Sequence, residues 1–463
     1  MSSSHAATIP QARLALRRSL WRGTSMNWLF CGLAVAVLAS VLLVLFAFHV
    51  PPLQDYGDWT YQGYLLNRLL RSAAAPVLIK PWPVPNSISE ILLALLGFAC
   101  GPITAARALI VAYLLASAVV MAVASRGRDG RINGAKLLLL LCIGTVHAPF
   151  WTGEINYQIG LMLFLAYVLL CRRSREPSAL FTGGYAVLLF LCHALCLGMF
   201  MIYEGWRSLR RRQILRAFVS FVPVLLMAAW YKLADPRTEV AALESRPQLH
   251  GVRDVIEYFT YQAAKTGPYH NFFFGGSGDY ERARLLYWAG VFANFAFAAC
   301  MAALMLTWIR ASWRERRGSD EFLAAVSFLA LAIFDPGAYL GIANVGERLI
   351  APALMLAVIS LRHTTLAERF GAALAALSAV VLVSFAVAGL HGAEGGPVPA
   401  NDVVNDPARR RQVLFWHKPF TFASQADQAE KSWAQGLPPS GPIAFETSLL
   451  MRPRGQGTAA PAR

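Results

Sequence analysis

Two aspartates in an aromatic-rich segment are the best candidates for chemistry in this sequence. Asp55 and Asp58 lie three positions apart in the stretch "LQDYGDWTYQGY". A carboxylate held there could take the proton of an acceptor hydroxyl, and a pair at this spacing could instead bind a divalent cation such as Mg²⁺ or Mn²⁺. Tyr56, Trp59 and Tyr61 suit a boundary where a sugar or lipid headgroup meets acyl chains. A solvated turn beside an aromatic belt would have the same composition, and this alternative stays open.

Four further polar residues could serve the same chemistry. Lys80 could meet a phosphate or simply extend from an interface, and His193 could carry a proton or be satisfied by a neighbour. Glu154 lies in the tight turn "HAPFWTGEINYQ", where helix capping by Glu154 and Asn156 would explain part of the polarity. His270 lies in "GPYHNFFFGGSGDYERAR", a stretch that could close over a substrate or anchor at the interface.

The elements that must position these groups are membrane-spanning helices. The chain has 463 residues, of which 56% are hydrophobic and 15% charged, against about 25% charged in soluble proteins. So few charges cannot cover a water-facing surface. Residues 28–48 carry no charge and are long enough to cross about 30 Å of hydrocarbon. With this first span the apolar segments predict eleven helices, the others at 103–125, 135–150, 156–171, 178–192, 194–206, 213–233, 285–309, 321–334, 346–361 and 370–390.

The positions of Lys and Arg predict how these helices alternate. If each crosses once, the arginine-rich connections share the side of the N-terminus, which the excess of basic residues assigns to the cytoplasm. This alternation requires 88–100 not to cross, and 13 residues are short for a span, so we expect an interfacial helix there. The cytoplasmic side then holds 22 basic and 7 acidic residues, and the outer side 20 and 19. The net charge of +16 is therefore an orientation signal, and no nucleic-acid partner is expected.

The predicted fold is an all-α polytopic transmembrane bundle with a cytoplasmic N-terminus and a C-terminus outside. A cytoplasmic segment 1–27 precedes a membrane domain 28–390, whose long outer loops are 49–102 and 234–284. An extracytoplasmic tail, 391–463, follows. No dinucleotide fingerprint, Walker A motif or GxSxG elbow stands in a supporting context, so no soluble catalytic domain is predicted.

The order of elements resembles the GT-C superfamily of integral-membrane glycosyltransferases. The features are a first span, an outer loop with an early aspartate, a proline-containing stretch leading to "LLGFACGPITAAR", and a span closed by an arginine-rich loop. A later segment, "GERLIAPALMLAVI", is similar to the family's Arg-aromatic-x-x-Pro pattern. Members such as the protein O-mannosyltransferases and the lipid A aminoarabinose transferases use sugars linked to polyprenyl phosphate.

The resemblance implies roles for three of these residues. It makes Asp58 a general base or metal ligand with Asp55 as second choice, although Trp59 stands where the family commonly has a glutamate. Arg348 matches the position expected to meet the lipid phosphate, which guanidinium binds bidentately. An ion pair of Arg348 with Glu347 or Asp335 is the alternative.

The expected activity is therefore transfer of a sugar from a polyprenyl-phosphate donor at the outer face of a bacterial inner (plasma) membrane. The acceptor would be a lipid, a glycan or a protein. A transporter or a lipid or polysaccharide flippase is the alternative without covalent chemistry, but transporters tend to place ionisable residues at the bilayer midplane. Here the polar residues gather at helix ends. A polymerase or ligase of surface polysaccharide is a third possibility.

Overall fold

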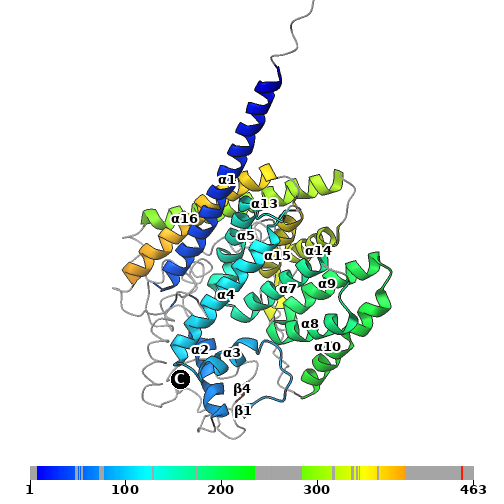
Figure 1. Cartoon of the computed structure of the whole chain (residues 1–463). Helices are drawn as coiled ribbons and strands as arrows, with labels where there is room; N and C mark the ends of the chain where they lie inside the picture. Colours follow the sequence, from blue (N-terminus) through cyan, green and yellow to red (C-terminus); the bar gives the residue numbers. More distant parts are fainter. Residues whose placement is uncertain are drawn as a thin grey trace, which may run out of the picture.

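The computed structural model is a helical bundle in which α1 projects past the other helices at its N-terminal end (Figure 1). The structure describes residues 8–46, 51, 53, 56–71, 78–127, 130–173, 176–234, 252, 284–314, 319–334, 338–339, 342–343, 345–361, 364–392 and 450–451.

Helices account for nearly all of the described secondary structure. They are α1 (Thr8–Phe46), α2 (Tyr56–Leu70), α3 (Ile88–Leu96), α4 (Pro102–Ala124), α5 (Gly134–Thr145), α6 (Ala148–Trp151), α7 (Ile155–Arg173), α8 (Ala179–Cys192), α9 (Ala194–Arg210), α10 (Ile214–Ala234), α13 (Arg284–Arg314), α14 (Asp320–Phe334), α15 (Val345–Ser360) and α16 (Thr364–Gly392). The strands in the described part of the chain have two residues each: β1 (Leu78–Ile79) pairs antiparallel with β4 (Leu450–Met451), and β2 (Ala338–Tyr339) with β3 (Ile342–Ala343). The all-α prediction is confirmed.

Six helical segments are long and apolar enough to cross a membrane. They are Ser25–Phe46, Pro102–Ala124, Ile155–Arg172, Ile214–Ala234, Phe292–Trp313 and Leu366–Val383. Three further apolar helical segments are shorter, namely Gly134–Thr145, Ala179–Cys192 and Arg348–Ser360. Each of the eleven apolar segments picked out from the sequence contains a helix. The membrane-embedded character follows from the long helices, while the number of eleven spans and their orientation stay predictions.

Helix α15 lies inside the bundle and packs against α5, α13 and α14. Its residues 351–359 are all buried, which explains why this segment is apolar on every face. A Cβ on Gly346 would lie 2.9 Å from the backbone oxygen of Ala332, so α14 and α15 approach closely there. Two cationic side chains donate to backbone oxygens at the C-terminal end of α15. Arg172 donates to the oxygen of Ile359 at 2.9 Å, and Lys136 donates to the oxygen of Leu361.

The arginine-rich connections meet at one end of the bundle, which we call the basic end. Asn27 of α1 is hydrogen-bonded to Ile132, in the connection before α5, at 3.1 Å. Arg172 of α7 and Arg210 of α9 both pair with α14, through Glu321 at 3.5 Å and Asp320 at 2.8 Å. Arg211, before α10, pairs with Glu176, before α8, at 2.5 Å. These contacts group three of the connections that the charge pattern had grouped, and the side of the membrane on which they lie stays a prediction.

Helices α2 and α3 lie at the opposite end, which we call the α2 end. The helix expected within 88–100 is α3, whose interfacial position stays a prediction, and α2 was not expected from the sequence. Tyr56, Trp59, Gly63 and Leu66 recur at helical spacing and face inward, and this pattern could have predicted the helix. A Cβ on Gly63 would lie only 2.3 Å from the Cβ of Leu93, so glycine is needed for α2 to lie against α3.

Candidate functional site

A buried ion pair between α7 and α15 is the centre of the candidate site. Arg348, in the first turn of α15, donates from Nη2 to Oε1 of Glu154 at 2.5 Å. The two side chains are 14% and 13% exposed. Glu154 precedes α7 directly, so the pair joins elements 194 residues apart in the sequence. Glu154 is therefore a partner of Arg348 that the sequence did not suggest, while the side chains of the alternatives considered there, Glu347 and Asp335, lie outside the described part of the structure.

Tyr157 and His193 extend this pair into a cluster of four residues, called here the Arg348 cluster. The hydroxyl of Tyr157 donates to the backbone oxygen of Arg348. Its ring packs edge-on against that of His193, with centroids 5.6 Å apart. Three breaks in helical structure, before α7, between α8 and α9 and before α15, therefore meet at one point.

His193 has a structural role at the start of α9. Its Nδ1 accepts a hydrogen bond from the amide of Leu195 at 3.1 Å, and the residue is 8% exposed. A nitrogen that accepts this bond carries no proton, so Nδ1 is not available to donate to a phosphate. The alternative considered from the sequence was that a neighbour satisfies the imidazole, and that neighbour is the backbone of α9. A catalytic role of His193 could therefore involve only Nε2.

Trp59 joins α2 to the turn that carries Glu154. Its indole N–H donates to the backbone oxygen of Gly153 at 3.1 Å, and the side chain is 5% exposed. Tyr56 packs edge-on against the Trp59 ring at 5.0 Å. Because Asp58 precedes Trp59, this bond fixes the Asp58 backbone near the turn that holds Glu154. The residue that departs from the GT-C pattern has a definite positioning role here.

Asn156 holds the proline-containing stretch and α3 against the start of α7. Its amide nitrogen donates to the backbone oxygen of Asn86 at 2.8 Å, and its oxygen accepts from the amide of Ser89 at 2.8 Å. The side chains of Glu154 and Asn156 are thus both engaged in tertiary contacts. Capping explains part of this polarity, because Asn156 accepts from an amide in the first turn of α3, while the Glu154 side chain pairs with Arg348.

Several buried oxygens at this end make no hydrogen bond within the described part of the protein. They are Oγ1 of Thr60, Oδ1 of Asn86, Oγ of Ser89 and Oε2 of Glu154. Thr60 and Ser89 are 2% and 0% exposed, so bulk water does not reach them. Buried polar atoms are usually paired, so each of these oxygens has the capacity to accept a hydrogen bond from a group outside the described residues. These acceptors are suited to polar ligand hydroxyls.

A second polar chain lies deeper along α4 and α7. The hydroxyl of Tyr113 donates to Oε1 of Gln158 at 2.9 Å, and the Gln158 amide lies 2.9 Å from Nε2 of His147. With its oxygen occupied by Tyr113, Gln158 donates to His147, whose Nε2 therefore accepts. All three residues are at least 95% buried. This chain satisfies Nε2 of His147, while the buried Nδ1 makes no hydrogen bond in the described part of the structure.

Some of the candidates from the sequence cannot be assigned a geometry. Asp55 and His270 lie outside the described residues, and only the helical backbone of α2 is described for Asp58 and Tyr61. Lys80 is half-buried between β1 and α3, and its role toward phosphate stays a prediction. Of the eight candidates, the structure brings Arg348, Glu154 and His193 together.

The described residues contain no group of three or more His, Cys, Asp or Glu side chains that could hold a metal ion. Glu154 has one oxygen engaged by Arg348, so it is poorly suited to bind a cation in this arrangement. The proposed ligands, Asp55 and Asp58, have no described side chains. Their metal-binding role stays a prediction.

No protein-family model, curated protein or solved structure matches the chain.

Loss of the hydrogen bond between Trp59 and Gly153 is expected to lower the stability slightly. Trp59→Phe removes the donor but keeps an aromatic ring, and the Gly153 oxygen still accepts from the amide of Ile155. The free energy of unfolding should fall by about 1 kcal/mol. Thermal unfolding in detergent measures this change.

Trp230→Phe is the matched control for that experiment. The Trp230 indole donates to the oxygen of Trp82 at 3.1 Å, but both side chains are half exposed, so other polar groups replace the lost donor. We expect less than about 0.5 kcal/mol of destabilisation. Equal effects of the two variants would contradict the anchoring role of Trp59.

Proposed function

We propose that the protein is a membrane glycosyltransferase that moves a sugar from a polyprenyl-phosphate donor to an acceptor hydroxyl at the outer face of the membrane. The observation that carries the proposal is the Glu154–Arg348 ion pair beside the anchored start of α2. It supplies a guanidinium for a phosphate and a carboxylate oxygen without a partner, next to the backbone of Asp58. The absence of a dinucleotide or Walker A motif in the sequence agrees with a lipid-linked donor.

The reaction divides between Asp58 and Arg348. The acceptor oxygen forms a bond to the anomeric carbon while the bond from that carbon to the phosphate oxygen breaks. Asp58 takes the proton of the acceptor hydroxyl, and the electron pair leaves with the polyprenyl phosphate. Arg348 stabilises the negative charge on the departing phosphate. Glu154 positions Arg348, and its second oxygen can accept a hydrogen bond from a sugar hydroxyl.

An apolar hollow between α4 and α7 supports a lipid donor. Its enclosed volume is about 10 Å³, so a lipid chain enters only where the lining side chains move aside, and these are mainly Met121, Met162, Met355 and leucines. Methionine side chains adapt to irregular apolar ligands. Tyr113 lines the hollow and is hydrogen-bonded to Gln158, one residue from Tyr157 in the Arg348 cluster. An isoprenoid chain in this hollow would have its phosphate near that cluster.

The test is release of polyprenyl phosphate by the purified protein given polyprenyl-phosphate mannose or polyprenyl-phosphate aminoarabinose with a membrane extract as acceptor. We expect Asp58→Asn to lower turnover by about 10²- to 10⁴-fold, the range of general base catalysis. EDTA treatment followed by Mg²⁺ or Mn²⁺ tests the cation.

Asp320→Asn is the control, because Asp320 pairs with Arg210 at the basic end and should leave turnover within about twofold. Unchanged turnover in Asp58→Asn would remove Asp58 from the mechanism. If the wild-type protein moves donor lipid across vesicles without releasing any sugar, the flippase alternative replaces the transferase.

A further inference from the structure

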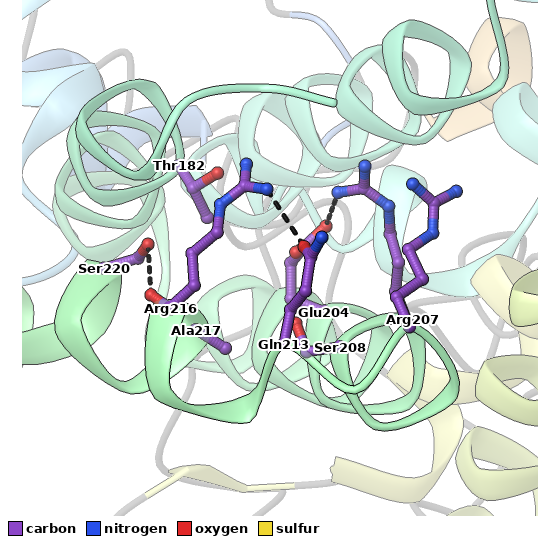
Figure 2. A pocket seen from close by; sticks show the side chains of 9 residues that line it. Thr182, Glu204, Arg207, Ser208, Gln213, Arg216, Ala217 and Ser220 are labelled. Carbon is purple, nitrogen blue, oxygen red and sulfur yellow. Dashed lines mark hydrogen bonds and ion pairs between the residues drawn. The ribbon is translucent and has the colours of Figure 1, made fainter. Parts of the chain in front are cut away.

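An arginine-lined hollow at the basic end is separate from the Arg348 cluster. It lies where the end of α9 and the start of α10 meet α8, and its enclosed volume is about 10 Å³, so a phosphate enters only where the arginine side chains part. Its polar lining comes from Glu204, Arg207 and Ser208 of α9, Arg211 and Gln213 of the connection, Arg216 and Ser220 of α10, and Thr182 of α8 (Figure 2).

A closed ion pair lies on one wall of this hollow. Arg207 donates from Nη1 to Oε1 of Glu204 at 2.8 Å, and the side chains are 5% and 6% exposed. Nε of Arg207 is also buried and makes no hydrogen bond within the described residues. One cationic side chain in the hollow therefore keeps a donor that the described protein does not use.

Two other arginines share a single carboxylate at the rim. Glu176 accepts from Arg211 at 2.5 Å and, through its other oxygen, from Arg216 at 2.9 Å and Gln213 at 2.8 Å. Hydrogen bonds from Arg211 and Gln213 lower the pKa of Glu176 to about 2, so it stays ionised at neutral pH. Three arginines and two carboxylates meet here, which leaves one positive charge.

The surface next to the hollow is apolar. Leu180 at the start of α8 is 87% exposed, and Leu215, Phe218 and Val219 at the start of α10 are 76%, 61% and 55% exposed. In a membrane-embedded protein such side chains face acyl chains. A cationic hollow on helices that also carry exposed apolar side chains suits the two parts of a phospholipid, a phosphate and a hydrocarbon chain.

We propose that this hollow binds the phosphate of an anionic phospholipid headgroup, with the acyl chains against α8 and α10. Arginine suits the role better than lysine because its planar donors match phosphate oxygens in pairs, and every basic residue in the connection 207–216 is arginine. If these arginines served only to orient the protein in the membrane, their positive charge would be enough and they would not need to line a hollow. Arg211 and Arg216 hold the phosphate, and Glu176 competes with it for the same donors.

The experiment measures the thermal unfolding temperature of the full-length protein in detergent with added phosphatidylglycerol, phosphatidylcholine or inorganic phosphate. It also counts retained lipids by native mass spectrometry. Phosphatidylglycerol should raise the unfolding temperature and stay bound, and the other two probes should not. Equal effects of phosphatidylglycerol and phosphatidylcholine would overturn the proposal. A shift by inorganic phosphate equal to that by phosphatidylglycerol would overturn the lipid assignment in favour of a phosphate-ion site.

Three variants separate headgroup binding from a structural role. The double variant Arg211→Gln, Arg216→Gln should lower the affinity for phosphatidylglycerol at least tenfold. Glu176→Gln removes the competing carboxylate and should raise it about threefold or more, a gain that a merely structural carboxylate would not produce. Arg212→Gln is the control, because Arg212 is exposed and does not line the hollow.

Unchanged affinity in the double variant, or a loss in Glu176→Gln equal to that in the double variant, would contradict the proposal. If the double variant does not fold, Glu176→Gln against Arg212→Gln still decides the question. None of these measurements depends on sugar transfer, so the proposed transferase activity and this site can fail independently.

Discussion

Replacing Arg348 with methionine is expected to lower the free energy of unfolding by about 3–5 kcal/mol, because the change leaves the buried carboxylate of Glu154 without its cation. The loss should be measurable as unfolding at lower temperature or denaturant concentration in detergent. It should also abolish sugar transfer, since Arg348 is the proposed phosphate ligand. A variant that is less stable but fully active would separate Arg348 from the reaction.

The double variant Arg348→Met, Glu154→Leu tests the physical reason. A buried ion pair replaced by apolar side chains of similar size is often close to neutral in stability. We therefore expect the double variant to recover most of the stability that Arg348→Met loses, while transfer stays absent. No recovery would mean that the loss arises from packing around α15 rather than from the unpaired charge.

Arg210→Met is the matched control for an ion pair of similar length. Arg210 and Asp320 are 2.8 Å apart, but Arg210 is 46% exposed and Asp320 is 18% exposed. Exposed pairs contribute about 0–1 kcal/mol, so this variant should remain close to the wild type in stability. If Arg210→Met costs as much as Arg348→Met, burial of the Glu154–Arg348 pair is not the cause.

Two adjacent glycines of α8 should respond in opposite directions to alanine. A Cβ on Gly183 would lie 2.8 Å from the backbone oxygen of Ser220 in α10, which no side-chain rotation can relieve. Gly183→Ala should therefore lower the free energy of unfolding by about 1–3 kcal/mol. A Cβ on Gly184 meets nothing within 4 Å, so Gly184→Ala should raise stability by up to about 1 kcal/mol through helix propensity.

Thermal unfolding of the two variants in the same detergent checks this prediction. Because Ser220 lines the arginine hollow, Gly183→Ala should also weaken phosphatidylglycerol binding, and Gly184→Ala should not. Equal stabilities of the two variants would contradict the close approach of α8 and α10.

Local properties of the chain were enough to predict the long apolar helices, but not α2. Whether a segment is apolar over the length of a span depends on its own residues, and all eleven apolar segments contain a helix. The arginine-rich connections could be grouped for the same reason, since charge is read directly from the sequence. Asp58, Glu154, His193 and Arg348 could be named as candidates because few polar residues stand at helix ends.

Only the tertiary structure decided which of these groups touch. Arg348 pairs with Glu154 across 194 residues, and Trp59 bonds to Gly153 across 94 residues. His193 caps α9, and α2 lies against α3 where Gly63 meets Leu93. Such contacts depend on how whole helices pack, and side-chain partners far apart in sequence leave no local signal in hydropathy or charge. The sequence by itself determined a membrane-embedded helical bundle with polar helix ends, and packing decided which polar residues form one site.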